Sequence, residues 1–213
     1  MEVTSQISAA VIEGKVEEAK KLAQEALETG KTARTILDEG LISGMDYVGV
    51  QFKNGAMFIP EVLLSARAMQ AALNILKPQL AEGKARMRGK VVLGTVQGDL
   101  HDIGKNLVGM MLEGAGFEVY DLGKDVEPGA FVEVVKERAP DIVGVSALLT
   151  TTMPMMQSTI NALAEAGIRD RVKIMVGGAP VTAGFAKQIG ADGYGADAVA
   201  VVDLAKEFVG AKT

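Results

Sequence analysis

The fold is decided by residues 90–122, KVVLGTVQGDLHDIGKNLVGMMLEGAGFEVYDL. This stretch opens with an apolar run at 90–96, passes through a polar loop that contains glycine, continues with a helical pattern at 105–116 and ends in a second apolar run at 117–122. Two short buried strands joined by a helix form a right-handed crossover, in which the strands lie parallel. The stretch therefore predicts an α/β domain with a parallel sheet.

The same alternation of strand and helix continues to the end of the chain. The later apolar runs and helical patterns occupy, in chain order, 128–140, 141–148, 153–167, 172–178, 181–190, 191–195 and 197–209. Five strands that alternate with helices predict a doubly wound, flavodoxin-like (Rossmann-like) parallel five-stranded sheet. Such sheets bind their ligands at the carboxyl ends of the strands.

The first part of the chain follows a different pattern and contains only helices. The four helical segments are 3–14, 15–30, 32–55 and 59–80, with Pro60 at the expected first helical position of the last one. Four helices with short connections predict a small antiparallel four-helix bundle before the α/β domain. The polar, basic segment 81–90 is the expected linker, so we expect a helical domain at 1–88 and an α/β domain at 89–213.

Composition narrows the possible functions. The formal net charge of −5 argues against nucleic acid as a partner, because phosphate binding favours a basic surface. The absence of cysteine excludes disulfides, a thiolate zinc site and a cysteine nucleophile. No apolar stretch reaches the ~20 residues that a membrane helix needs, and no leader segment is visible. We therefore expect a cytoplasmic protein.

The loop after the first predicted strand holds the one histidine of the chain, His101, two residues beyond Asp99. A histidine that binds a metal usually donates its second ring N–H to a carboxylate, and Asp99 or Asp102 could serve. A zinc ion needs three or four protein ligands, which one histidine and no cysteine do not provide. His101 is therefore either a capping or hydrogen-bonding residue of the loop, or an axial ligand to a metal that a macrocycle already holds.

Three motifs at the ends of predicted strands one, three and four favour the second interpretation. They are Asp99-x-His101-x-x-Gly104, Ser146-x-Leu148 and Gly177-Gly178. Together they resemble the base-off/His-on cobalamin-binding domain of methionine synthase. The segment GAMFIPEVLLSARAM at 55–69 resembles the helical bundle cap that precedes this domain. They also resemble the small corrinoid proteins of methyltransferase systems, such as those that serve methylamines, methanol and glycine betaine.

The resemblance implies a role for each matching residue. His101 would bind cobalt from below in place of the dimethylbenzimidazole of the cofactor, Asp99 would hydrogen-bond His101, and the hydroxyl of Thr152 would complete this relay. Part of the helical face near Phe58, otherwise bundle core, would cover the upper side of cobalt. The other cofactor-binding residues implied are Gly98, Asp102, Ile103, Gly104, Ser146, Leu148, Thr150, Gly177, Gly178, Ala179, Tyr194 and Gly195.

The function implied is that of a corrinoid methyl carrier, which is one subunit of a methyltransferase system and not a complete enzyme. Its cofactor would be methylcobalamin or hydroxocobalamin. Its partners would be a substrate-specific methyltransferase, an acceptor methyltransferase and a corrinoid reactivation protein. The alternatives are a cobalamin-binding sensor module and, less well matched because of the helical bundle, a mutase subunit.

Overall fold

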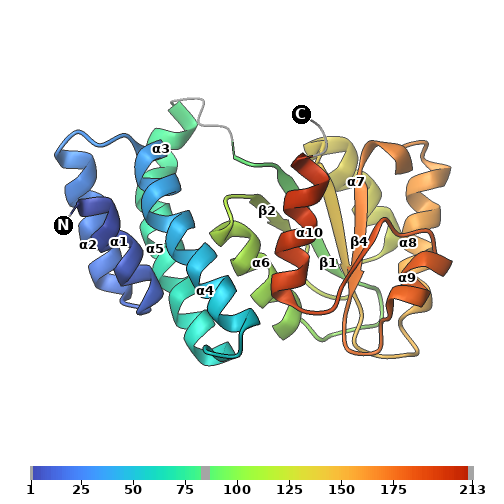
Figure 1. Ribbon diagram of the computed structural model, residues 1–213. Helices are drawn as coiled ribbons and strands as arrows, with labels where there is room; N and C mark the ends of the chain where they lie inside the picture. Colours follow the sequence, from blue (N-terminus) through green and yellow to red (C-terminus); the bar gives the residue numbers. More distant parts are fainter. Residues whose placement is uncertain (1, 83–86, 211–213) are drawn as a thin grey trace. The chain divides into compact units, whose positions relative to one another are not determined.

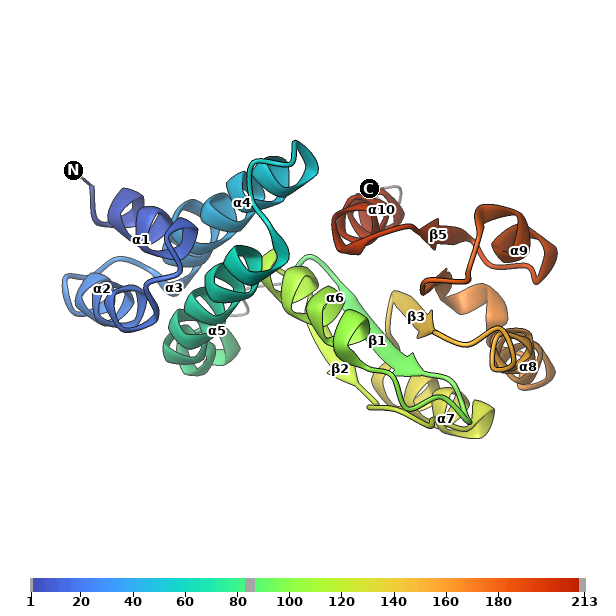
Figure 2. The ribbon, with the colours of Figure 1, turned by 90° about the horizontal axis from the view of Figure 1, so that it is seen from below.

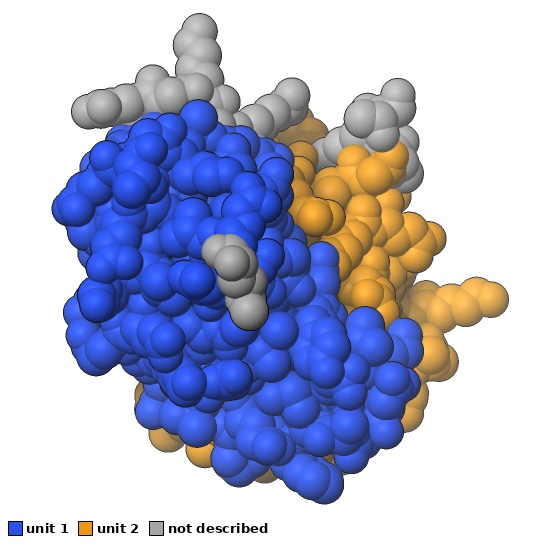
Figure 3. All heavy atoms as spheres, turned by 60° about the vertical axis from the view of Figure 1, so that its left-hand side comes forward, with its two compact units in different colours: residues 1–87, 113–116 blue, residues 88–112, 117–213 orange. Residues whose placement is uncertain are grey.

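The chain divides into two units, which Figure 3 colours separately. The first comprises residues 1–87 with 113–116, and the second comprises 88–112 with 117–213. The computed structural model describes residues 2–82 and 87–210. Within these ranges, no helix is both long and apolar enough to cross a membrane.

The first unit contains the four expected helical runs (Figure 1). The third run is continuous but changes type along its length, with a π-helix in its middle. The runs are α1 (Val3–Ile12), α2 (Val16–Glu28), α3 (Ala33–Thr35) with the π-helix η1 (Ile36–Ile42) and α4 (Ser43–Lys53), and α5 (Ile59–Glu82). Pro60 is the second residue of α5 and not the first.

The core of the first unit comes from the apolar positions of these helices. Ile7, Leu41 and Leu73 are all fully buried or nearly so. The π-helix was not predicted, because the spacing of four from Leu37 to Leu41 and of three from Ile42 to Met45 also fits an ordinary α-helix. Phe58, just before α5, is 68% exposed, so it does not belong to the bundle core.

The second unit contains the predicted alternation of strands and helices. Its sheet is parallel throughout and has the order β2-β1-β3-β4-β5, which confirms the flavodoxin-like fold. The elements are β1 (Lys90–Thr95), α6 (Ile103–Gly114), β2 (Glu118–Asp121), α7 (Pro128–Arg138), β3 (Ile142–Ser146), α8 (Pro154–Glu165), the short 3-10 helix η2 (Arg169–Arg171), β4 (Lys173–Gly177), α9 (Ala183–Gln188), β5 (Gly193–Gly195) and α10 (Ala198–Gly210).

The structure describes only part of the linker expected at 81–90. Helix α5 runs to Glu82 and β1 begins at Lys90, and residues 83–86 lie outside the part of the chain that the structure describes.

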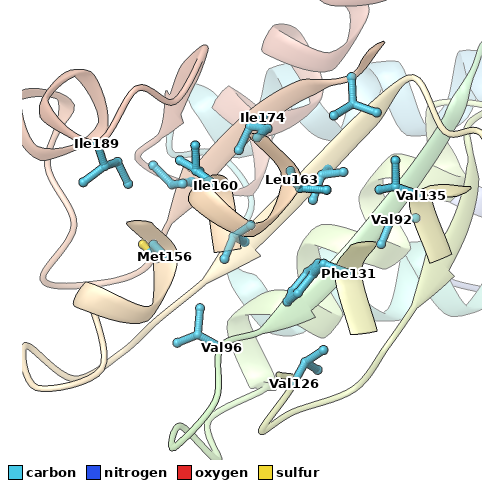
Figure 4. Packing of buried hydrophobic residues seen from close by; sticks show 14 of the residues in the cluster. Val92, Val96, Val126, Phe131, Val135, Met156, Ile160, Leu163, Ile174 and Ile189 are labelled. Carbon is cyan, nitrogen blue, oxygen red and sulfur yellow. The ribbon is translucent and has the colours of Figure 1, made fainter. Parts of the chain in front are cut away.

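Helices cover both faces of the sheet (Figure 2). On one face, Val92 of β1 belongs to a buried cluster with Phe131 of α7, Leu163 of α8 and Ile189 at the end of α9 (Figure 4). On the other face, Leu93 of β1 lies beside Gly109 of α6. Strand β5 packs against α10. Because both faces are covered, the strands are almost continuously apolar, as parallel strands usually are. Polar residues are therefore found at the ends of the strands, including their carboxyl ends.

Candidate functional site

The sequence motifs meet in one row at the carboxyl edge of the sheet. Thr95 pairs with Ser146, Ser146 with Gly177 and Gly177 with Gly195 across four neighbouring strands. Residues in register in a parallel sheet point to the same face. The row therefore places the last residues of β1, β3, β4 and β5 side by side, next to the loop that carries His101.

Asp99, and not Asp102, is the carboxylate that holds His101. The Asp99 side chain is fully buried, and its Oδ1 lies 2.8 Å from His101 Nδ1 and 3.1 Å from the backbone N of His101. An ionised carboxylate only accepts hydrogen bonds, so Nδ1 carries the proton and the lone pair of a neutral ring is on Nε2. Because the His101 side chain is 51% exposed, this Nε2 is available to a ligand.

The second oxygen of Asp99 is held by the loop after β3. Asp99 Oδ2 accepts hydrogen bonds from Leu148 N at 2.7 Å, Leu149 N at 3.2 Å and Thr152 Oγ1 at 2.7 Å. Burial on its own raises the pKa of Asp99, but the hydrogen bonds from Thr152, Leu148 and His101 outweigh it and hold this pKa well below its usual range. The expected hydrogen bond from Thr152 is therefore present, and it stabilises the charged form of Asp99.

The backbone of the His101 loop is fixed by contacts that the sequence did not reveal. The Oγ1 of Thr95, a fully buried residue, donates to the carbonyl of His101 at 3.0 Å. Gly98 adopts a positive φ of 82°, a conformation that glycine reaches without strain. Gly104 lies in the first turn of α6, and the space next to its Cα is open. The only signal for Thr95 was its place as a hydroxyl residue near the end of a buried strand.

Large apolar side chains are exposed next to His101 in the sequence and in the loop that holds Asp99. Leu100 is 62% and Ile103 86% exposed beside His101, and Leu148 and Leu149 are each 41% exposed in the loop that holds Asp99. Apolar side chains exposed together usually mark a binding surface. Among residues 2–82 and 87–210, no group of three or more His, Cys, Asp or Glu side chains could hold a metal ion. A metal at His101 would therefore need its other donors from its own ligand.

The predicted glycines differ in what surrounds them. A Cβ on Gly177 would meet only the carbonyl oxygen of Gly195, at 3.0 Å, so the space beside it is otherwise open. A Cβ on Gly178 would overlap the carbonyl oxygen of Ala147, and Gly178 has a φ of 133°. A Cβ on Gly195 would overlap the side chain of Val201 in α10. Gly178 and Gly195 are thus required by the fold itself, whereas Gly177 leaves space that a ligand could use.

The remaining predicted residues fall into two groups. Ser146 is half-buried in the row of strand ends, and Asp102, Thr150 and Ala179 lie at or near the surface of the neighbouring loops. Tyr194 is placed differently. It is in register with Val176, one position away from the row, and packs against the buried cluster between the sheet and α7 to α9. The structure therefore does not bring the Tyr194 side chain to the face on which Ser146 and Gly177 lie.

Comparison with known proteins places these features in a family. The B12 binding domain family matches residues 89–203, and a second B12 binding domain family matches residues 3–77. The trimethylamine corrinoid protein 2 of Methanosarcina acetivorans is 47% identical over 210 residues, which cover 98% of this chain and 97% of that protein. A corrinoid protein of Desulfitobacterium hafniense is 40% identical over 213 residues, which cover 99% of each chain.

Solved structures agree with these sequence matches. A methanol:cobalamin methyltransferase complex, MtaBC, from Methanosarcina barkeri matches with a TM-score of 0.87 and 31% identity, and the match covers 98% of this chain and 80% of that chain. A cobalamin-binding protein from Desulfitobacterium hafniense DCB-2 matches with a TM-score of 0.78 and 33% identity, over 98% of both chains. The chain thus belongs to the family of B12-binding corrinoid proteins, and its cofactor is cobalamin.

Proposed function

We propose that this chain is a corrinoid methyl carrier that binds cobalamin base-off, with His101 Nε2 as the lower axial ligand. One observation carries the proposal. Asp99 is buried and holds Nδ1 of the exposed His101 ring at 2.8 Å, so Nε2 is the free nitrogen. A ring with this tautomer and a fixed orientation is what an axial metal site requires.

The surroundings of His101 fit a corrin macrocycle and its displaced nucleotide tail. The exposed side chains of Leu100, Ile103, Leu148 and Leu149 offer an apolar surface to a flat ring. Gly177 leaves open space at the end of β4, in register with Ser146, where we place the tail. Tyr194 packs on the opposite face of the sheet, so we leave it out of this site.

When bound, the cobalt supplies the centre that accepts and releases the methyl group. The protein's own residues control the ligand below it. Asp99 accepts the hydrogen bond from Nδ1, which keeps the proton on that nitrogen and leaves the lone pair of Nε2 for the ligand position. Thr152, which donates to the other oxygen of Asp99, fixes the orientation of that carboxylate.

The methyl group would be loaded by a substrate-specific methyltransferase and removed by an acceptor methyltransferase, with a corrinoid reactivation protein as a third partner. Two findings support this arrangement: relatives named for trimethylamine and dimethylamine, and a matching structure of a methanol:cobalamin methyltransferase complex. In such a system the choice of methyl donor lies in the partner, since the carrier presents only the cofactor.

The axial ligand can be tested because the chain has a single histidine. Protein labelled with nitrogen-15 histidine is loaded with hydroxocobalamin and reduced to the Co(II) state. Its electron paramagnetic resonance spectrum should show the doublet splitting of nitrogen-15, and the unlabelled protein should show a triplet. His101→Ala should lose this splitting. A triplet that persists in the labelled protein would come from dimethylbenzimidazole and would overturn the proposal.

The carrier role is tested separately by cofactor preference and by transfer. A carrier should bind hydroxocobalamin or methylcobalamin at least as tightly as adenosylcobalamin. It should also accept methyl groups when it is mixed with methylamine or methanol methyltransferases and their substrates. A strong preference for adenosylcobalamin, with no transfer from any donor of such a panel, would favour the sensor alternative.

A further inference from the structure

We propose that Asp125, in the loop after β2, is a positioning residue that fixes the start of the His101 loop before the cofactor binds. The inference rests on the proposed axial role of His101 and adds a residue that acts on it through the backbone. The hydrogen bonds of Asp125 do not go to His101 itself. Asp125 contacts Gly98 and Asp99. These two residues begin the loop that carries the proposed ligand, His101, and Asp99 supplies the carboxylate that holds it.

Two hydrogen bonds of opposite direction connect Asp125 to this segment. The Oδ1 of Asp125 accepts from the backbone N of Gly98 at 2.7 Å, and the backbone N of Asp125 donates to the carbonyl of Asp99 at 3.1 Å. Together they fix the peptide units on both sides of the Gly98–Asp99 bond. Rotation at Gly98, which glycine otherwise allows freely, would break at least one of them.

The backbone of Asp125 is held in a conformation that suits this contact. Asp125 has a φ of 57°, in the left-handed region, which aspartate tolerates better than most residues. Its neighbours run alongside the strand end, with Thr95 N donating to Gly123 O and Val126 N donating to Thr95 O, each at 3.0 Å. Such a conformation persists where the surrounding contacts determine it, and here these contacts run to the end of β1 and to Gly98 and Asp99.

The same segment also holds the far end of the loop. Lys105, buried in the first turn of α6, places its Nζ 2.6 Å from Oδ1 of Asp121, the last residue of β2. Asp121 in turn accepts from Gly123 N at 2.8 Å. Residues 121–126 therefore contact the chain both before and after His101. A ligand held at both ends is organised in advance, which lowers the cost of binding a rigid cofactor.

The test compares three variants of the full chain. Asp125→Gly tolerates the left-handed backbone and keeps the N–H donor, but it removes the acceptor for Gly98. Asp125→Asn keeps an oxygen acceptor and tolerates the same backbone, so it should restore the contact. Lys124→Ala changes the exposed neighbouring residue and serves as the matched control.

The first readout needs no cofactor. Hydrogen exchange at the Gly98 amide of the apo protein should be about tenfold faster in Asp125→Gly, because this amide loses its side-chain acceptor. It should stay within about twofold of wild type in Asp125→Asn and Lys124→Ala, since the first keeps an acceptor and the second changes none. Unchanged exchange in Asp125→Gly would overturn the contact and the proposal with it.

The second readout reports on the ligand. With hydroxocobalamin bound and reduced to Co(II), Asp125→Gly should show a smaller or heterogeneous nitrogen-15 histidine splitting and bind the cofactor about three- to tenfold more weakly. Asp125→Asn should restore both. A normal splitting and affinity in Asp125→Gly, or an equal defect in Asp125→Asn, overturns the positioning role alone. A wild-type spectrum without histidine splitting overturns the axial proposal instead.

Discussion

The two ends of the site, around Asp99 and around Gly177, are built in opposite ways. At Asp99 a buried carboxylate accepts from five donors, so hydrogen bonds hold both oxygens of the group that supports the histidine. At Gly177 there is no side chain, and a Cβ placed there would meet only one carbonyl oxygen of the protein. This end of the site is therefore open space. Changes at the first end should therefore alter how the cofactor is ligated, and changes at the second end should alter whether it fits.

The largest effect is expected at Gly178, next to Gly177. Here a side chain should disrupt the fold itself and not only the fit of the cofactor. A valine there would bring a branched side chain into the Ala147 carbonyl oxygen, at a φ of 133° that residues with a Cβ rarely adopt. We expect Gly178→Val to lose more than about 4 kcal/mol of the free energy of unfolding. Urea denaturation of the apo protein measures this loss. A variant as stable as wild type would show that the backbone at Gly178 can relax.

Gly177→Val separates cofactor fit from stability. Gly177 lies at a strand end, and the new side chain would meet only the Gly195 carbonyl among protein atoms near its Cβ. The apo protein should lose about 1 to 2 kcal/mol, while hydroxocobalamin binding should fall at least about tenfold. Equilibrium binding followed by absorbance gives the comparison. Wild-type affinity in this variant would place the nucleotide tail elsewhere.

At the other end, Asp99→Asn should change the tautomer of His101. The Oδ2 side of residue 99 faces two backbone N–H groups, from Leu148 and Leu149, and the Oδ1 side faces one, from His101. The amide oxygen of asparagine should therefore face Leu148, which turns its NH₂ toward His101. Nδ1 would then accept, and the proton would move to Nε2. Nitrogen-15 chemical shifts of the apo ring should show this change, and the Co(II) splitting from histidine should weaken.

The same substitution should make stability depend less on pH. The folded-state pKa of Asp99 is depressed by the hydrogen bonds of Thr152, Leu148 and His101. The ionised Asp99 therefore contributes fully to the free energy of unfolding above its unfolded-state pKa of about 4. This contribution is lost as the pH falls below that value. At pH 7, Asp99→Asn should cost about 2 to 3 kcal/mol. This difference should shrink steadily from pH 5 toward pH 3 in urea titrations, and a constant difference would contradict the depressed pKa.

The sequence could predict the features of the site that depend on local sequence, but not the contacts between distant segments. The strands, the helices and the strand-end positions of Asp99, Ser146 and Gly177 came from apolar periodicity and from motifs, which depend on local sequence. The contacts of Leu149 N and of Asp125 are backbone or loop contacts between distant segments, and no residue type marks them in advance. The sequence could not show on which face of the sheet Tyr194 lies, because β5 consists of Gly-Tyr-Gly. With glycine on both sides, there is no apolar alternation to assign the side chain to one face.

The smallest effect is expected at Thr152, which distinguishes the roles of the two oxygens of Asp99. Thr152→Val keeps the shape but removes the donor to Asp99 Oδ2, which retains Leu148 N and Leu149 N. The apo protein should lose about 1 kcal/mol. The Co(II) splitting from His101 should persist, because Nδ1 bonds the other oxygen, Oδ1. Thr152→Ser keeps the hydroxyl and should lie closer to wild type.

Two measurements decide this last case. Urea denaturation of the apo proteins ranks wild type, Thr152→Ser and Thr152→Val, and the histidine splitting is recorded for the same three proteins. Retained splitting in Thr152→Val, together with its loss in Asp99→Asn, would show that the two oxygens of Asp99 have separate tasks. Oδ1 would then orient the ligand and Oδ2 would anchor the carboxylate to the loop after β3. Loss of splitting in Thr152→Val would mean instead that the anchor and the orientation of His101 cannot be separated.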